Sequence, residues 1–133
     1  MAMIKEPKPI PLTSEVYRRI PPNKRQGRTP HPDAFVNTGK EIIVGKGPGM
    51  SVNWADMASA VETQQSAKSR FPADSFGVIS LKVDEVHQIP NQEAFHIPSK
   101  KNPAHSAVTG EKDIEIQAQY IRISNWAISP DID

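Results

Sequence analysis

The sequence contains no cysteine. This absence excludes disulfides, zinc–thiolate sites, iron–sulfur clusters and thiol nucleophiles. Aromatic residues make up only 6% of the chain, and no apolar run approaches the about 18 residues that a membrane-spanning helix needs. The first twelve residues are interrupted by prolines and lack the apolar stretch of a secretory signal peptide. We therefore expect a cytoplasmic protein that makes no membrane contact.

A strong excess of one charge is also missing. The chain has 16 Lys and Arg against 15 Asp and Glu, which gives a net charge of +1. A dedicated nucleic-acid-binding protein usually has a much larger basic excess. The charge is nevertheless uneven, because residues 1–33 carry a net charge of +4. Weak nucleic-acid binding through this basic segment is one possibility, but a solvated tail is expected first, since no aromatic residues interleave with the charges.

Proline is abundant, with 13 residues in 133. Proline fixes φ and lacks an amide hydrogen, so the proline-rich segment 1–13 is expected to be extended. It is either a flexible arm or an edge segment lying along the body. The sequence thus predicts an arm at 1–13, a single domain at 14–128 and a tail at 129–133.

Several short runs rich in β-formers lie between turn signals and predict strands. A further short strand is possible at 34–36, and residues 50–53 are expected to be extended. The strand with the most continuous apolar run, 76–83, is expected to be central and buried. The predicted strands are 15–20, 41–44, 76–83, 94–97 and 104–108.

Helical spacing of apolar residues predicts a helix near 54–68, with Asn53 as its N-cap. Residues 84–88 could form one helical turn. Residues 113–127 fit both a strand and a helix, and we favour a helix capped by Asp113. The resulting fold class is α+β, a single domain in which two helices pack on a small, mainly antiparallel sheet with a proline-rich N-terminal arm.

Two histidines lie at either end of a proline-bounded loop, in the pattern His96-x-Pro98…Asn102-Pro103-x-His105. If strands 94–97 and 104–108 form a hairpin centred between residues 100 and 101, His96 lies directly opposite His105. Two adjacent imidazoles could share general-base and general-acid catalysis. Spacing alone does not supply such a site, so we favour the interpretation that the two histidines are unrelated.

Other polar residues are candidates for binding an anion. Arg18 and Arg19 lie on a predicted strand, where only one of them can face inward as an anion ligand. Lys100, Lys101 and Asn102 lie in the loop between the histidines. The segment Gly45–Gly49 lacks the spacing of a phosphate-binding loop and is expected to be a glycine-rich turn.

The order of several short motifs resembles that of a group of small bacterial proteins that have no established activity. These motifs are Tyr17-Arg18-Arg19-Ile20-Pro21-Pro22, Ala34-Phe35, Ser51-Val52-Asn53-Trp54, Gly77-Val78-Ile79-Ser80-Leu81, His96-x-Pro98, Asn102-Pro103-Ala104-His105 and Gly110. The resemblance implies a bacterial, cytoplasmic accessory protein whose last segment is helical. It carries over no catalytic residues, and the longer insert around 37–49 departs from the group.

The leading functional prediction is a non-enzymatic binding or interaction module without cofactor or metal. Its partner would be another protein or a second copy of the chain, contacted by strand addition or in polyproline form. The alternative is a small metal-independent phosphodiesterase or RNA-cleaving toxin that uses His96 and His105. A second alternative is the weak nucleic-acid binding described above. Whether the protein is an enzyme is left open.

Overall fold

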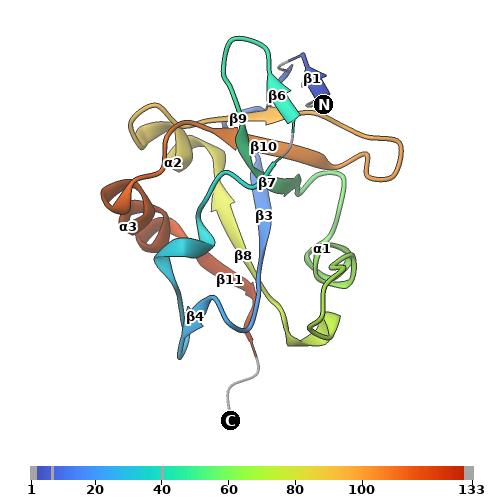
Figure 1. The fold of residues 1–133 in the computed structure, drawn as a ribbon, viewed down its shortest axis with the longest axis vertical. Helices are drawn as coiled ribbons and strands as arrows, with labels where there is room; N and C mark the ends of the chain where they lie inside the picture. The colour runs from blue at the N-terminus through green and yellow to red at the C-terminus, as the bar shows by residue number, and fades with distance from the viewer. Residues whose placement is uncertain (1–2, 7, 40, 131–133) are drawn as a thin grey trace.

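A seven-stranded antiparallel sheet organises the chain into a single α+β domain (Figure 1). The structure, a computed structural model, describes residues 3–6, 8–39 and 41–130. The spatial order of the strands is β11-β8-β3-β7-β10-β9-β2. Their bounds are β2 (Lys8–Pro9), β3 (Glu15–Ile20), β7 (Gly49–Trp54), β8 (Gly77–Lys82), β9 (Glu93–His96), β10 (His105–Thr109) and β11 (Asn125–Ile128).

The remaining elements lie around this sheet. β1 (Met3–Lys5) and β6 (Glu41–Ile43) form a separate parallel pair, and β4 (Arg25–Gln26) and β5 (Thr29–Pro30) form a small hairpin. Two short 3₁₀ helices lie in connections, η1 (Pro32–Ala34) and η2 (Ala73–Ser75). The α-helices are α1 (Ala60–Gln65), α2 (Val83–Gln88) and α3 (Ile114–Ile123), and Figure 1 shows α2 and α3 on one side of the central strands and α1 on the other.

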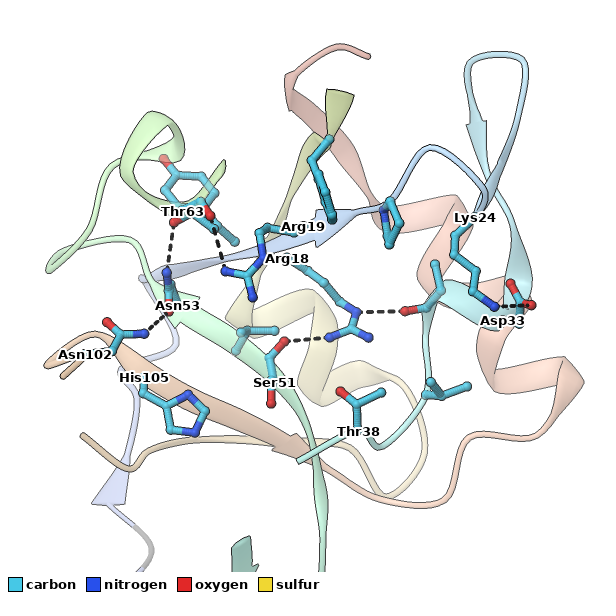
Figure 2. Close-up of a pocket in the computed structure, with 16 residues that line it drawn as sticks. Arg18, Arg19, Lys24, Asp33, Thr38, Ser51, Asn53, Thr63, Asn102 and His105 are labelled. Carbon is cyan, nitrogen blue, oxygen red and sulfur yellow. Dashed lines mark hydrogen bonds and ion pairs between the residues drawn. The ribbon is translucent and has the colours of Figure 1, made fainter. Parts of the chain in front are cut away.

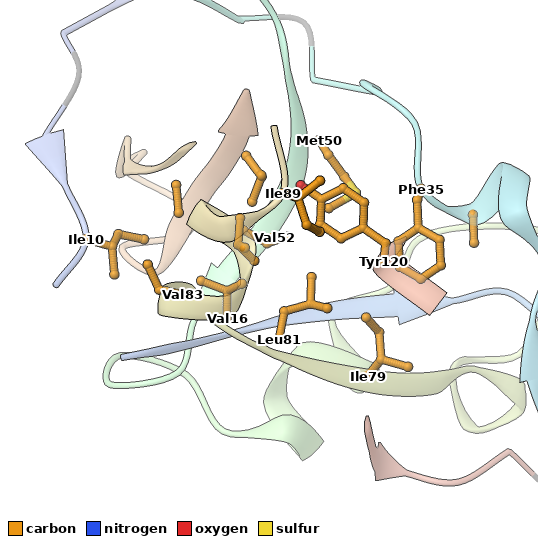
Figure 3. Close-up of a cluster of buried hydrophobic side chains, with 14 of the residues drawn as sticks. Ile10, Val16, Phe35, Met50, Val52, Ile79, Leu81, Val83, Ile89 and Tyr120 are labelled. Atoms are coloured by element: carbon orange, nitrogen blue, oxygen red, sulfur yellow. The ribbon is translucent and has the colours of Figure 1, made fainter. Parts of the chain in front are cut away.

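The main hydrophobic core lies between the sheet and the side that carries α2, α3 and η1. Alternate residues of β3, such as Val16 and Ile20, point to this side and are fully buried. Tyr120 of α3 lies in the same core, stacked on Phe35 with ring centroids 5.5 Å apart (Figure 3). Its hydroxyl donates a hydrogen bond of 2.7 Å to Gln92, so the buried polar group is satisfied.

A smaller apolar cluster lies on the opposite face, at the β9 end of the sheet. It consists of Ile43, Phe95, Ile97 and Ala107. Phe95 pairs with Ala107 in the β9–β10 hairpin, and their neighbours Ala94 and Val108 belong to the main core. Because successive strand residues point to opposite faces, the two clusters sandwich this part of the sheet.

The predicted helix at 54–68 is wrong in its bounds. Trp54 is the last residue of β7, and α1 begins only after Ser59. Ser59 is the N-cap in place of the predicted Asn53, and it forms a capping box with Glu62. Strand pairing of residue 54 with Val16 outweighs the helical spacing of the apolar residues that follow.

Residues 34–36 are not a strand, because Pro32 starts the 3₁₀ turn η1 instead. The predicted strand at 41–44 exists as β6, although it pairs outside the main sheet. The predicted helical turn at 84–88 is part of α2.

The C-terminal helix and its cap are confirmed. Asp113 accepts a hydrogen bond of 2.9 Å from the amide of Ile116 and caps α3. The helix ends at Ile123, and β11 follows it and pairs with β8, so the predicted helical range of 113–127 is too long.

The proline-rich segment lies along the body as an edge strand. β2 pairs with β9, and the amide of Ile10 donates to the carbonyl of Ala94 at 3.2 Å. Residues 1, 2 and 7 of the predicted arm and 131–133 of the predicted tail lie outside the described residues. In the described part of the chain, no helix has the length and apolar character needed to cross a membrane.

Candidate functional site

The candidate site lies where β3 and β7 separate. β3 pairs with β8 along all six of its residues, but with β7 only at Val16 and Tyr17. Beyond Tyr17 the two strands diverge and leave their facing backbone groups without ladder partners. A cavity of about 540 Å³ opens at this point, lined from β3, β7, β10, α1 and the η1 region (Figure 2).

Arg18 occupies the gap between the separating strands. Its Nε donates to the carbonyl of Ala34 and its Nη1 to the carbonyl of Ser51, both at 2.7 Å. Because β3 does not pair with β7 at Ser51, the carbonyl of Ser51 accepts its hydrogen bond from the Arg18 side chain instead. Burial, together with the positive charge of Arg19, lowers the pKa of Arg18 to about 10, so the guanidinium stays charged at neutral pH.

Arg19 points to the other face of β3 and contacts α1. Its Nη1 donates to the Ser66 hydroxyl at 2.8 Å and to the carbonyl of Thr63 at 3.3 Å. Burial lowers its pKa as well. Both arginines thus line the cavity, whereas strand alternation alone allowed only one inward arginine. The separation of β3 from β7 opens the cavity to both faces at this position.

A chain of amide and hydroxyl groups forms a second part of the wall. Asn102 donates to Asn53 at 2.8 Å, and Asn53 donates to the hydroxyl of Thr63 at 3.1 Å (Figure 2). Asn102 also accepts from the amide of Ala104 at 3.1 Å. The chain therefore fixes the positions of β7, α1 and the loop before β10 relative to one another.

The cavity has an excess of positive charge. Its lining includes Arg18, Arg19 and Lys24, against Asp33 as its one acidic side chain among the described residues. Asp33 already forms an ion pair of 2.9 Å with Lys24, whose hydrogen bond is the main cause of the lowered pKa of this carboxyl. Neither arginine forms an ion pair within the described parts of the chain.

His105 lines this cavity, whereas His96 does not. His105 pairs with Asn53 across β10 and β7, and both side chains point toward the cavity. The Nε2 atom of His96 lies 2.7 Å from the carbonyl oxygen of Pro103, and its ring makes an edge contact with Trp54.

The predicted hairpin exists, but the hypothesis that His96 lies opposite His105 is wrong. His96 pairs with Ser106, and Ile97 donates to the carbonyl of His105 at 3.0 Å. The loop therefore spans residues 98–104 and is centred on Lys101. This shift of one residue places the two imidazoles on opposite faces of the sheet.

The remaining predicted binding residues fall into two groups. Asn102 lines the cavity beside Arg19, and Lys101 lines an adjoining cavity. Lys100 is exposed and lines neither of them. The segment Gly45–Gly47 is a turn in which both glycines have positive φ, as the glycine-rich turn interpretation predicted, and it lies outside both cavities.

Most of the cavity residues were not among the predicted site residues. Tyr17, Asn53 and Thr63 are brought together by strand pairing and by the placement of α1, which no local pattern encodes. Lys24 reaches the cavity from the turn before β4. The Ser-x-x-Glu pattern at residues 59–62 could have located the start of α1 and hence the position of Thr63.

Lys112 lies close enough to Arg18 for the two positive charges to interact, but it does not line the cavity. Its Nζ donates to Asn37 and to the carbonyls of Val108 and Gly110, the latter two at 2.9 Å. Burial and the charge of Arg18 lower the pKa of Lys112 to about 7. These partners are neutral, so this lysine adds positive charge without a compensating carboxylate among the described residues.

No group of three or more histidine, aspartate or glutamate side chains among the described residues is placed to hold a metal ion. The polar groups that line the cavity are guanidinium, ammonium, amide, hydroxyl and imidazole groups, together with the carboxylate of Asp33, which is already paired with Lys24. Such a set suits the recognition of an anion by hydrogen bonds.

No protein-family model matches the chain, and neither a curated protein nor a solved structure matches it at a significant level. The resemblance to small bacterial proteins stays a prediction.

Proposed function

We propose that this domain binds a small molecule that carries a phosphate group, in the cavity between β3 and β7. The observation that carries the proposal is the guanidinium of Arg18, which lies in the wall of this cavity with two carbonyl partners and, within the described part of the chain, no carboxylate. Its Nη2 makes no hydrogen bond to the described residues.

The free energy of burying charge supports this proposal. Removing a charged group from water is costly unless an opposite charge compensates it. Here the neighbouring charges of Arg19 and Lys112 have the same sign and increase the cost. A phosphate bound at Nη2 would offset this cost, because a hydrogen bond between a guanidinium and a phosphate oxygen joins two opposite charges.

The size and lining of the cavity favour an organic phosphate over a bare ion. A volume of about 540 Å³ lies in the usual range of roughly 300–1,000 Å³ for small-molecule sites. Apolar groups of Pro21, Val36 and Phe76 line the cavity beside the polar ones. They would contact the uncharged part of the ligand.

This proposal keeps the predicted class of a binding module and replaces the protein partner with a small ligand. The phosphodiesterase alternative has less support, because it relied on two adjacent imidazoles and His96 lies on the other face of the sheet. An assay for reaction products after incubation with the ligand distinguishes binding alone from catalysis by His105.

Calorimetric titration of the full chain with AMP, pyrophosphate and adenosine tests the proposal. We expect AMP to bind with a Kd below about 1 mM and neutral adenosine to bind at least about tenfold more weakly, with affinity falling as salt is added. If neither phosphate compound saturates the protein at millimolar concentration, the proposal is wrong.

Arg18→Met is expected to weaken AMP binding at least about tenfold, since it removes the fork and its charge. Arg18→Lys keeps the charge, and it serves if the first variant does not fold by circular dichroism. Arg122→Gln is the matched control, because Arg122 is exposed on α3 and lines neither cavity. Equal affinities for the Arg18 and Arg122 variants would contradict the proposed site.

A further inference from the structure

A second cavity, of about 440 Å³, adjoins the first. The two cavities share Arg19, Asn53 and Asn102 as a common wall. We infer that the ligand is a dinucleotide, with one nucleoside in each cavity, the phosphate of the first nucleotide at Arg18 and the next phosphate, in the linker, at Arg19. This inference rests on the proposed function and specifies its ligand class.

Arg19 can contact a group that passes between the cavities. Only its Nη1 is engaged, with Ser66 and the carbonyl of Thr63. Its Nε and Nη2 make no hydrogen bonds to the described residues. These two nitrogens form one edge of the guanidinium, and such an edge binds two oxygens of one phosphate.

The second cavity also has an excess of positive charge. Lys68 and Lys101 line it together with Arg19, against Glu62 as its one carboxylate among the described residues. Glu62 already accepts a hydrogen bond of 2.9 Å from the amide of Ser59, which is the main cause of its lowered pKa. A ligand that bridges the cavities therefore meets positive charge on both sides of the wall.

The common wall is firmly held, so the two cavities keep their separation. Asn102 donates a hydrogen bond to Asn53, and Asn53 donates one to Thr63. A bulky ligand would have to break this chain in order to fill both cavities. Two broad units joined by a thin linker fit without breaking it.

The lining of each cavity suits a nucleoside. Tyr17 and Phe76 line the first cavity, and Met57 and Pro103 line the second. Bases stack on aromatic side chains through their faces, and apolar side chains such as Met57 and Pro103 offer similar surfaces for contact. A phosphodiester and a pyrophosphate linker offer the same anionic oxygens to Arg19, so both linkers belong to the inferred class.

The test compares the affinity of the full chain for AMP, for 5′-phosphorylated diadenylate and for diadenosine pyrophosphate. We expect at least one of the dinucleotides to bind about tenfold or more tightly than AMP, since a second unit binds at high effective concentration. The preferred dinucleotide identifies the linker. If AMP binds as tightly as both dinucleotides, the inference is wrong and the proposed function stands.

Lys101→Ala provides an independent readout at the second cavity. It is expected to weaken binding of the preferred dinucleotide about three- to tenfold and to leave AMP binding unchanged. Lys100→Ala is the matched control, because its side chain is exposed and lines neither cavity. An equal loss for AMP and dinucleotide in Lys101→Ala, or an equal loss in both lysine variants, would overturn the inference. Failure of every phosphate compound to bind the wild-type chain would instead refute the proposed function itself.

Discussion

The core and the cavity treat polar groups in different ways. In the core under α2 and α3, the Tyr120 hydroxyl donates to Gln92, which in turn donates to the carbonyl of Glu111 at 3.0 Å. At the cavity, which opens to both faces of β3, the guanidinium groups of Arg18 and Arg19 make hydrogen bonds only to neutral acceptors among the described residues.

This difference distinguishes polar groups that stabilise the fold from polar groups that are available to bind a ligand. Burial raises the pKa of Tyr120, so the phenol remains neutral and its hydrogen bond is complete. Polar groups in the core therefore stabilise the fold. The cavity holds like charges together, which opposes folding, and such local costs are typical of binding sites.

The largest expected effect is in the core. Leu81→Ala removes a fully buried side chain of β8 and is expected to lower the free energy of unfolding by about 2–5 kcal/mol. Urea denaturation measures this loss. Calorimetry under folding conditions should still show AMP binding at the wild-type affinity.

Lys82→Ala is the control on the same strand. Its side chain is exposed, so the expected change in unfolding free energy is within about 0.5 kcal/mol. If Leu81→Ala abolished AMP binding in the folded protein, the core and the cavity would not be independent.

A tyrosine in the core and another at the cavity allow a matched comparison. Tyr120→Phe leaves the buried Gln92 oxygen without its donor and is expected to cost about 1–3 kcal/mol of unfolding free energy. Tyr17 lines the cavity, and its hydroxyl makes no hydrogen bond to the described residues. Tyr17→Phe is therefore expected to change stability by less than about 0.5 kcal/mol. Equal losses in urea denaturation of the two variants would contradict the comparison.

Lys112 predicts a pH dependence of stability. Its pKa of about 7 in the folded protein lies below the ordinary value of 10.5, so the unfolded chain binds more protons between these pH values. The free energy of unfolding is therefore expected to rise between pH 7 and pH 9, on the order of 1 kcal/mol. Lys112→Met should flatten this rise in urea titrations at each pH.

Lys82→Met is the control for this dependence of the unfolding free energy on pH, because the Lys82 side chain is exposed to solvent in the folded protein as in the unfolded chain. The same slope in the wild type and in Lys112→Met would show that another group titrates.

The smallest expected effect is at the cap of α1, on the cavity side. Ser59→Ala removes the acceptor of the Glu62 amide, which lies 3.0 Å from the serine hydroxyl. The expected loss is about 1 kcal/mol of unfolding free energy. Glu62→Gln keeps an oxygen acceptor for the Ser59 amide and should be nearly neutral. A larger loss for Glu62→Gln than for Ser59→Ala in urea denaturation would contradict the assigned cap.

Local sequence patterns correctly predicted the elements that depend mainly on neighbouring residues. The strands at 15–20, 76–83, 94–97 and 104–108 have β-forming runs between turn residues, and the structure contains all four within one or two residues. Asp113 caps α3 as predicted, because an N-cap depends on residues only three positions apart.

The errors arise where distant residues decide the outcome. Residue 54 continues β7 because it pairs with Val16, which its helical spacing does not reveal. The register of the β9–β10 hairpin depends on one extra loop residue, and this residue moves His96 away from His105.

The cavity was only partly predictable for the same reason. Arg18, Arg19, Asn102 and His105 were candidates from their residue types, and the structure brings them around one cavity. The cavity itself forms because β3 leaves β7 after two residue pairs, a property of the sheet as a whole.

The short strand at residues 8–9 has a consequence for the behaviour of the protein at high concentration. An unprotected sheet edge can template growth of fibrils, because it offers a row of unused amide donors. Here the strand that closes this side of the sheet is two residues long, and Pro9 has no amide hydrogen to offer to an incoming chain. The positive charge of the exposed Lys8 further repels a second copy. The prolines that give the N-terminal segment its extended form thus also disfavour the addition of another strand at this edge, and with it aggregation.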